Sequence, residues 1–205
     1  MPNLELNHNR QSAETASAGI KFSTIIQLVV GLSCFAVAAM IALDTWQDIY
    51  DTSSYNKIIA ETANRHGITE EILRAIIKRE SSYQAWQVGA DDEVGLMQIT
   101  AGAAKDWELH HNAKCPQKGV LFDPRLNIEI GAWYFADALN RWSQFRHSHA
   151  LALAQYNAGP QQAAEWAPAD KDNNVINKVS FPGTKKYIKQ VIKYRNKYRN
   201  KSKQK

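Results

Sequence analysis

Residues 72–82 read Ile72-Leu73-Arg74-Ala75-Ile76-Ile77-Lys78-Arg79-Glu80-Ser81-Ser82, and this stretch decides the fold. Ile72, Ile76 and Glu80 are spaced four residues apart, so a helix places their side chains on one face. Such a face must turn toward a core when further apolar residues widen it. The residues that widen it here are Ile68, Leu73 and Ile77.

The carboxyl group of Glu80 has two interpretations. On a buried stripe it would be costly unless paired or protonated, and burial would raise its pKa toward the value that a general acid needs near neutral pH. Alternatively, Glu80 is the first exposed residue after the helix, or it pairs with Arg79 or Arg74, since structural ion pairs also perturb carboxyl groups. The helix alone leaves both interpretations open.

The charge of the chain is unevenly distributed. The net charge is +5, but residues 185–205 hold ten Lys or Arg and no acid, so the rest, with 15 basic and 20 acidic residues, carries −5. A basic segment of this kind could bind nucleic acid, anionic lipid or an acidic polymer. We favour a solvated last helix and a disordered basic tail at 196–205, with no specific nucleic-acid partner.

Residues 22–43 form an apolar run without a charged side chain. As a helix it would extend roughly 33 Å, enough to cross a hydrocarbon core of about 30 Å. A signal peptide is the alternative, but its apolar region would be shorter. We expect an uncleaved single-pass anchor in the cytoplasmic membrane. Arg10 and Lys21 precede the run and only Lys57 follows it closely, which weakly places the main domain on the periplasmic or extracytoplasmic side.

The rest of the chain is predicted to be one helical domain with appendages. Residues 1–21 are polar and expected to be disordered, and 44–54 form a juxtamembrane linker or a helical extension of the anchor. Gly67 stops the first helix of the domain, and Thr69 caps the next. Residues 83–98 are expected as a loop or short hairpin. Helices are expected at 55–66, 69–80, 101–108, 125–142, 148–156, 161–167 and 184–198.

Three further segments carry polar groups suited to a binding site. Gly95-Leu96-Met97-Gln98 lies on a turn, and Gln155-Tyr156-Asn157-Ala158-Gly159 ends an apolar helix before a Gly-Pro stop. Tyr187 follows on the last helix. Buried amides need hydrogen-bond partners, and sugar hydroxyls and N-acetyl groups offer both donors and acceptors.

Together with Glu80-Ser81, these motifs resemble the catalytic domain of soluble lytic transglycosylases, glycoside hydrolase family 23, which is related to goose-type lysozyme. The resemblance covers residues 55–195, about two thirds of the chain. Each motif alone is weak, but four in this order and spacing are highly specific. The resemblance implies a mainly α, lysozyme-like α+β domain with a very small β component, preceded here by a single N-terminal transmembrane helix.

The resemblance also implies roles for single residues. Glu80 would act as general acid and then as base, and the substrate-binding residues would be Ser81, Met97, Gln98, Tyr156, Asn157 and Tyr187. Two positions depart from the family pattern. Gln155 stands where Ala is usual, and Gly89 stands where many members have a Ser that hydrogen-bonds the acid. Asp91, Asp92 and Glu93 make the loop after it unusually acidic.

The activity that the resemblance implies is cleavage of the β-1,4 bond between N-acetylmuramic acid and N-acetylglucosamine in peptidoglycan glycan strands. The family route needs one carboxyl group, whereas ordinary glycosidases use two. Two alternatives remain: a lysozyme-type hydrolase on the same fold, and a silent wall-binding protein that assembles with cell-wall or secretion machinery. No cofactor is implied.

Other aromatic and metal-ligating residues give weaker signals. Five tryptophans could stack on sugars, but helical spacing favours the core for all except Trp86. The pairs His110-His111 and His147/His149 lack the further ligands that a metal site needs. Cys34 and Cys115 are not expected to form a disulfide, because the first lies in the apolar run and the second in a polar loop.

Overall fold

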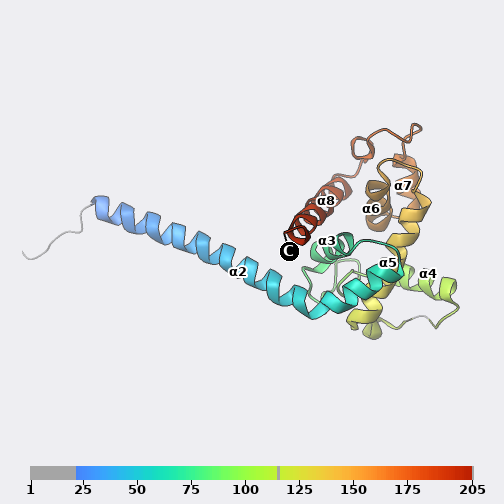
Figure 1. The fold of residues 1–205 in the computed structure, drawn as a ribbon, viewed down its shortest axis with the longest axis horizontal. Helices are drawn as coiled ribbons and strands as arrows, with labels where there is room; N and C mark the ends of the chain where they lie inside the picture. Colours follow the sequence, from blue (N-terminus) through green and yellow to red (C-terminus); the bar gives the residue numbers. More distant parts are fainter. Residues whose placement is uncertain (1–21, 115, 205) are drawn as a thin grey trace, which may run out of the picture. The chain divides into compact units, whose positions relative to one another are not determined.

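A computed structural model describes residues 22–114 and 116–204 of the chain, with side chains at 25–42, 54–114 and 116–204 (Figure 1). The expected disorder at 1–21 and the side chain of Cys115 lie outside the described residues. The described chain divides into two units between Ile49 and Tyr50.

Helix α2 (Phe22–Arg65) contains the apolar run. Large apolar side chains of its segment Ile25–Ala42 are exposed, among them Phe35 at 74% and Met40 at 70%. By length and composition this segment can cross a membrane, since its 18 residues extend about 27 Å as a helix. The structure therefore has a helix suited to the anchor expected at 22–43, and its insertion in a membrane stays a prediction.

The backbone of α2 is helical through residues 44–54. The juxtamembrane connection is thus helical, and the helix expected to begin at residue 55 is the continuation of one that begins at Phe22. The physical reason is the absence of glycine and proline between residues 44 and 65, because these residues interrupt helices most strongly.

Gly67 ends α2 as the sequence predicted. Its φ is +63°, a left-handed conformation that glycine adopts without a steric cost. The Gly67 N–H donates to the Asn64 carbonyl (3.3 Å), and the Ile68 N–H donates to the Ala63 carbonyl (3.0 Å). These two bonds satisfy carbonyl groups of the last turn and aim the chain into the next helix.

Helix α3 (Glu70–Ser81) is the helix predicted from the opening stretch. Thr69 is its N-cap residue, but the Thr69 side chain forms no capping hydrogen bond. Glu70 in the first turn pairs instead with Arg74 at 2.9 Å, four residues along the helix.

The apolar stripe of α3 packs into the core against α8 (Pro182–Ser202), and Figure 1 shows these helices side by side. Ile72, Leu73, Ile76 and Ile77 are fully buried. Burial of each such side chain contributes about 1.5–3 kcal/mol relative to exposure. The prediction of a core-facing α3 is confirmed.

The remaining helices complete the domain around this pair. Helix α5 packs on α6, and α6 packs on both α7 and α8. Thr100 and Asp123 cap α4 and α5 by accepting hydrogen bonds from backbone N–H groups of the first turns. Their bounds are α4 (Ala101–His111), η2 (Lys118–Phe122), α5 (Pro124–Arg141), α6 (Ser148–Ala158), α7 (Pro160–Trp166) and η3 (Val175–Asn177).

The β component is very small. Between α3 and α4 the described chain has two isolated antiparallel bridges, which join Val88 to Val94 and Val94 to Ile99. The expected loop or short hairpin at 83–98 is therefore a loop with single bridges. The prediction of a mainly α domain is confirmed.

Candidate active site

Glu80 lies in the last turn of α3. The helix ends because Ser82 and Tyr83 turn into the left-handed region, with φ of 51° and 69°. The hydroxyl of Ser81, only 6% exposed, donates to the Leu96 carbonyl at 2.9 Å. This bond ties the end of α3 to the loop that contains the Gly-Leu-Met-Gln motif.

The Glu80 carboxyl group is largely removed from water. Burial raises its pKa from 4.5 to about 7, against the hydrogen bond from Tyr187 and the charge of Arg79, both of which lower it, while the charge of Glu93 raises it further. The Tyr187 hydroxyl donates to Glu80 Oε1 at 2.6 Å. A carboxyl group with this pKa is partly protonated at neutral pH, as a general acid requires.

The alternative ion pairs of Glu80 are not formed. Arg74 donates to Glu70 and, at 2.6 Å, to Asn56. The Arg79 guanidinium lies 5.3 Å from the centre of the Tyr187 ring and acts on Glu80 through its charge. Glu80 is therefore a largely desolvated acid, and of the two interpretations the structure favours the one with a raised pKa.

Asn127 on α5 holds the loop that faces Glu80. It is fully buried, and its side chain binds three backbone groups. Its Oδ1 accepts from the Met97 N–H at 2.7 Å, and its Nδ2 donates to the carbonyls of Val94 and Leu121, each at 2.8 Å. Sequence reasoning missed this residue, although a polar side chain between apolar neighbours on a core-facing helix was the available signal.

Gln98 has an unusual backbone, with φ of 50°. Its side-chain nitrogen donates to the carbonyl groups of Gln87 (3.2 Å) and Gly95 (2.9 Å). Both N–H groups are thus used within the loop, so the amide is held in one orientation and its oxygen is the atom left to face a ligand.

A cavity of about 240 Å³ lies beside this amide. The Tyr156 hydroxyl, on the cavity wall, donates to the Met97 carbonyl at 2.8 Å. Burial and the charge of Glu80 raise the pKa of Tyr156 well above its usual value, so the phenol stays protonated and Glu80 is within electrostatic reach of the cavity. The cavity is lined by Gln98, Ile99, Thr100, Ala103, Tyr134, Gln155, Tyr156, Asn157 and Gly159.

The sequence-predicted residues fall into three groups. Gln98, Tyr156 and Asn157 line the cavity, whereas Glu80 and Tyr187 form a hydrogen-bonded pair next to it. Ser81 and Met97 are buried and support the loop, and their contact with substrate stays a prediction. Tyr134 on α5 lines the cavity and was missed because its helical spacing looked like that of a core residue.

Residues 57–179 match the family model described as the transglycosylase SLT domain, which covers more than half of the chain. The chain belongs to the SLT-domain family. Among curated relatives, membrane-bound lytic murein transglycosylase C of Cronobacter sakazakii is 30% identical over 138 residues, and that of Yersinia pestis (strain Pestoides F) is 31% identical over 137 residues. Each alignment covers 63% of this chain and 38% of the relative, so the chain spans under two fifths of their length.

Solved structures agree with the family assignment. The 70-kDa soluble lytic transglycosylase of Escherichia coli has a TM-score of 0.65 and 26% identity, covering 71% of this chain and 24% of that one. A complex of the 70-kDa soluble lytic transglycosylase with bulgecin A gives a TM-score of 0.68, 26% identity, and coverage of 80% and 27%. An inactive mutant of Slt from Pseudomonas aeruginosa, 24% identical, shares the fold with a TM-score of 0.67 over 76% of this chain and 25% of that one.

The first departure from the SLT-domain pattern, Gln155, is accommodated by a new hydrogen bond. Gln155 is 3% exposed, and its Oε1 accepts from the Trp142 indole nitrogen at 2.9 Å. The amide that stands in place of the usual Ala thus gives the buried indole N–H a hydrogen-bond partner. A buried N–H group without a partner would cost free energy.

The second departure, Gly89, is explained by Glu93. A β-carbon at position 89 would lie 2.2 Å from Glu93 Oε2 and 2.7 Å from Gln98 Oε1. The Glu93 carboxyl group thus occupies the space of a side chain at position 89, and it also accepts from the Asp91 N–H at 2.9 Å. In place of the hydroxyl of the family pattern, this site has a second carboxyl group that raises the pKa of Glu80.

The other candidate residues lie outside this pair and cavity. Trp86 is 73% exposed on the loop after α3, whereas Trp142 and Trp166 are buried. His110 and His111 on α4 contact the ring of Trp133, at 5.1 and 5.4 Å between ring centroids. Among the described residues, no group of three His, Cys, Asp or Glu is arranged to hold a metal ion.

Proposed function

We propose that this protein is a peptidoglycan lytic transglycosylase in which Glu80 is the catalytic acid and base. The observation that supports this most strongly is a largely desolvated carboxyl group with a pKa of about 7, held by Tyr187 beside a cavity lined with amide groups. Membership of the SLT-domain family and the names of the relatives point to the same reaction.

In the proposed reaction, protonated Glu80 gives its proton to the glycosidic oxygen between N-acetylmuramic acid and N-acetylglucosamine. The bond from that oxygen to C1 breaks, and the N-acetyl oxygen of the muramic acid stabilises the cation at C1. Ionised Glu80 then takes the proton of the C6 hydroxyl of the same sugar. The C6 oxygen bonds to C1 and closes a 1,6-anhydro ring, so the proton lost in the first step is restored in the second.

The pKa of Glu80 suits both steps. A carboxyl group that titrates near 7 is protonated in a large fraction of molecules and is also a stronger base than an ordinary glutamate once ionised. Intramolecular attack by the C6 hydroxyl gains its rate from proximity and needs no positioned water. The Tyr187 hydroxyl donates to Glu80 and would orient the carboxyl group in both steps.

The remaining site residues are assigned to binding and support. Gln98 and Asn157, with Tyr156 between them on the cavity wall, would orient the sugar hydroxyls and N-acetyl groups. Ser81 and Met97 would support the site by fixing the loop that contains the Gly-Leu-Met-Gln motif. The acidic group of Glu93 would keep Glu80 protonated at higher pH than burial alone.

We also propose a domain map and a location. Residues 22–43 would form a single-pass anchor in the cytoplasmic membrane, continued by helix through 44–54, with a lytic transglycosylase domain at 55–195 and a basic end at 196–205. The disorder expected for this basic end is wrong as far as Ser202, because these residues are the last turns of α8. The exposed apolar surface of Ile25–Ala42 and the membrane-bound relatives support this arrangement. Because the substrate is cell wall, the domain would act on the periplasmic side, as the charges flanking the run suggest.

The test is digestion of purified cell walls by the full chain in mild detergent, followed by mass spectrometry of the released muropeptides. The proposal predicts products one water lighter than hydrolysis products. It also predicts no release by Glu80→Gln, while Asp92→Asn, a charge change on the exposed part of the same loop, keeps activity. Fully hydrated reducing ends would identify a lysozyme-type hydrolase, and unchanged lysis by Glu80→Gln would refute the assignment of the acid.

A further inference from the structure

Helix α8 carries a row of lysines on the face opposite to the one that packs in the core. Lys186, Lys189 and Lys193 follow one another at spacings of three and four residues, so they share one face, and all three are exposed. We call them the lysine stripe. The buried face of the same helix is formed by Thr184, Tyr187, Ile188 and Val191.

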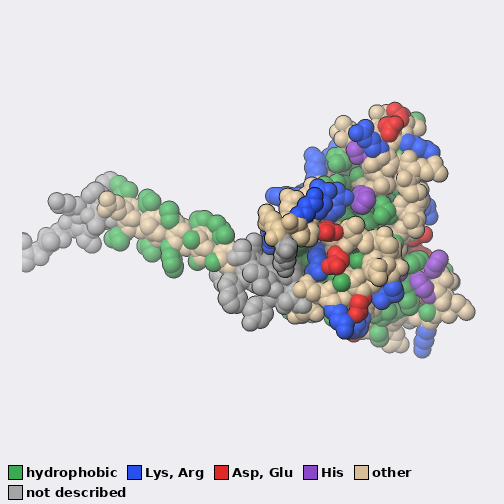
Figure 2. All heavy atoms as spheres, in the orientation of Figure 1, with side chains coloured by type: hydrophobic (Ala, Val, Ile, Leu, Met, Phe, Trp, Pro, Cys, Tyr) green, Lys and Arg blue, Asp and Glu red, His purple; other side chains and the backbone are tan. Residues whose placement is uncertain are grey.

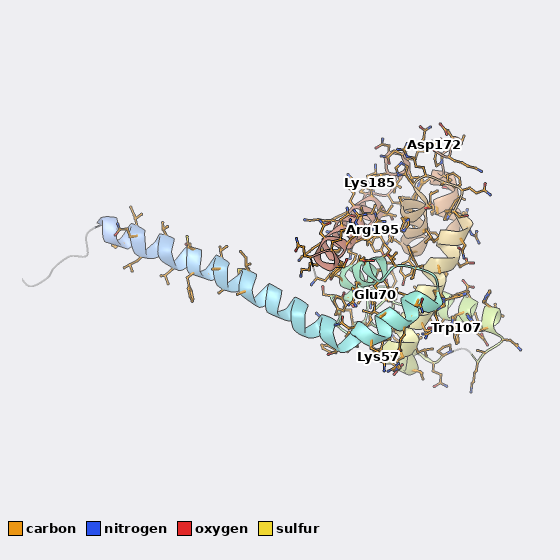
Figure 3. The ribbon with its side chains drawn as sticks, viewed as in Figure 1. Lys57, Glu70, Trp107, Asp172, Lys185 and Arg195 are labelled. Carbon is orange, nitrogen blue, oxygen red and sulfur yellow. The ribbon has the colours of Figure 1, made fainter. Side chains whose placement is uncertain are left out.

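The lysine stripe is not neutralised by neighbouring acids. Helix α8 contains no Asp or Glu, and none of the three lysines pairs with an acidic side chain in the part of the chain that the structure describes. Figure 2 shows Lys and Arg side chains gathered over this helix, and Figure 3 labels Lys185 and Arg195 along it. The surface therefore has a net positive charge available for an anionic partner.

Arg79 connects the stripe to the site. Its guanidinium lies 5.3 Å from the centre of the Tyr187 ring, and its charge acts on Glu80. A polar hollow of about 260 Å³ is lined by Lys186 together with Arg79, the neighbour of Glu80 on α3. The Arg79 Nε atom is buried and has no hydrogen-bond partner among the described residues. The remaining lining residues are Lys78, Ser82, Gln190 and Tyr194.

A second shallow surface continues from this hollow along α8. It is lined by Lys186, Lys189 and Lys193, with Pro182, Lys185 and Gln190. From Lys186 to Lys193 the helix rises roughly 10 Å, which is also the length of about three extended peptide residues. The two hollows share Lys186 and Gln190, so one anionic chain could follow the lysine stripe away from Glu80.

We propose that the lysine stripe binds the carboxylates of the stem peptide carried by the glycan strand being cleaved. This inference rests on the proposed function. In murein each stem peptide is attached to the lactyl group of a muramic acid, the sugar on which Glu80 would act, and it carries free carboxylates. A peptide leaving the reacting sugar therefore starts near Glu80, and Arg79, which lies beside the Tyr187 ring, shares a hollow with Lys186. Anionic lipid and nucleic acid have no such connection to the catalytic carboxyl group.

The experiment measures binding without cleavage. The full chain in mild detergent carries Glu80→Gln in every protein tested, and binding to insoluble walls is measured by co-sedimentation. The stripe variant is Lys186→Gln, Lys189→Gln and Lys193→Gln combined. The matched control changes the same number of exposed lysines away from α8, Lys57→Gln, Lys114→Gln and Lys178→Gln, so both proteins lose the same charge. Each is tested on walls that retain stem peptides and on walls from which an amidase has removed them.

We expect the stripe variant to bind peptide-bearing walls about tenfold more weakly than the parent, because three exposed charge contacts of modest strength are lost. The control should bind like the parent, and the difference should shrink at high salt. On peptide-free walls all three proteins should bind alike.

Equal binding of the parent and the stripe variant to peptide-bearing walls overturns the inference. So does an equal loss on both kinds of wall, which would place the contact on the sugars. The same proteins are also sedimented with vesicles that contain anionic phospholipid, and a loss confined to these vesicles would identify a lipid-binding surface and contradict the proposal. Failure of the parent itself to bind either wall would instead contradict the proposed function, so the two failures are distinguishable.

Discussion

The desolvated Glu80 carboxyl group should lower the free energy of unfolding of the native protein as the pH rises, and Glu80→Gln should abolish this decrease. The pKa of Glu80 is about 7 in the folded protein against 4.5 for a free side chain, because burial disfavours its charged form. Between these values the folded state retains a proton that the unfolded state has released. The contribution of Glu80 to stability is therefore fully present below pH 4.5, falls between pH 4.5 and 7, and is lost above that range. Two and a half pKa units correspond to about 3 kcal/mol in the free energy of unfolding.

The assay is urea unfolding of the parent and of Glu80→Gln, followed by tryptophan fluorescence at pH 4.5 and pH 8.5. The difference in unfolding free energy between the two proteins should shift by about 3 kcal/mol in favour of the variant at the higher pH. The control is Glu165→Gln, an exposed change on α7, which should follow the parent. A shift below about 1 kcal/mol for Glu80→Gln would refute the claim that this carboxyl group is held in a desolvated site.

Three other changes test the surroundings of Glu80. Glu93→Gln removes a charge that raises the pKa of Glu80, so the alkaline limb of the pH–activity profile should move to lower pH, while Asp92→Asn leaves it in place. Tyr187→Phe removes a hydrogen bond that lowers the same pKa, and the limb should move to higher pH. Asn127→Leu leaves three buried backbone groups unpaired, so it should lower the unfolding free energy by about 3–6 kcal/mol in urea titrations. A loss under about 1 kcal/mol would contradict the role of Asn127 in holding the loop.

The core-facing helix could be predicted from the sequence because it depends on local spacing, whereas the same spacing left open whether Glu80 is a desolvated acid or pairs with Arg79 or Arg74. Ile72, Ile76 and Glu80 share a face in any helix, and the structure buries the two isoleucines completely. Gly67 stopped α2 as expected because a positive φ is a local requirement. Such features need no knowledge of distant parts of the chain.

What sequence reasoning missed depends on contacts between distant segments. Asn127 is one polar residue among many, and only folding brings it to the loop 30 residues earlier that it binds through Met97. Only the folded loop shows that the Glu93 carboxyl group fills the space that a side chain at position 89 would need. The motif positions of Ser81 and Met97 likewise do not reveal that both side chains are buried.

In the proposed mechanism Glu80 uses the substrate's own C6 hydroxyl in place of water. The most direct measurement is digestion of purified walls in water enriched in oxygen-18, with mass spectrometry of the new muramic acid ends. The proposed mechanism predicts 1,6-anhydro ends that contain no oxygen-18, and no new ends with Glu80→Gln. New reducing ends that each contain one oxygen-18 atom would show that water attacks C1, and would contradict it.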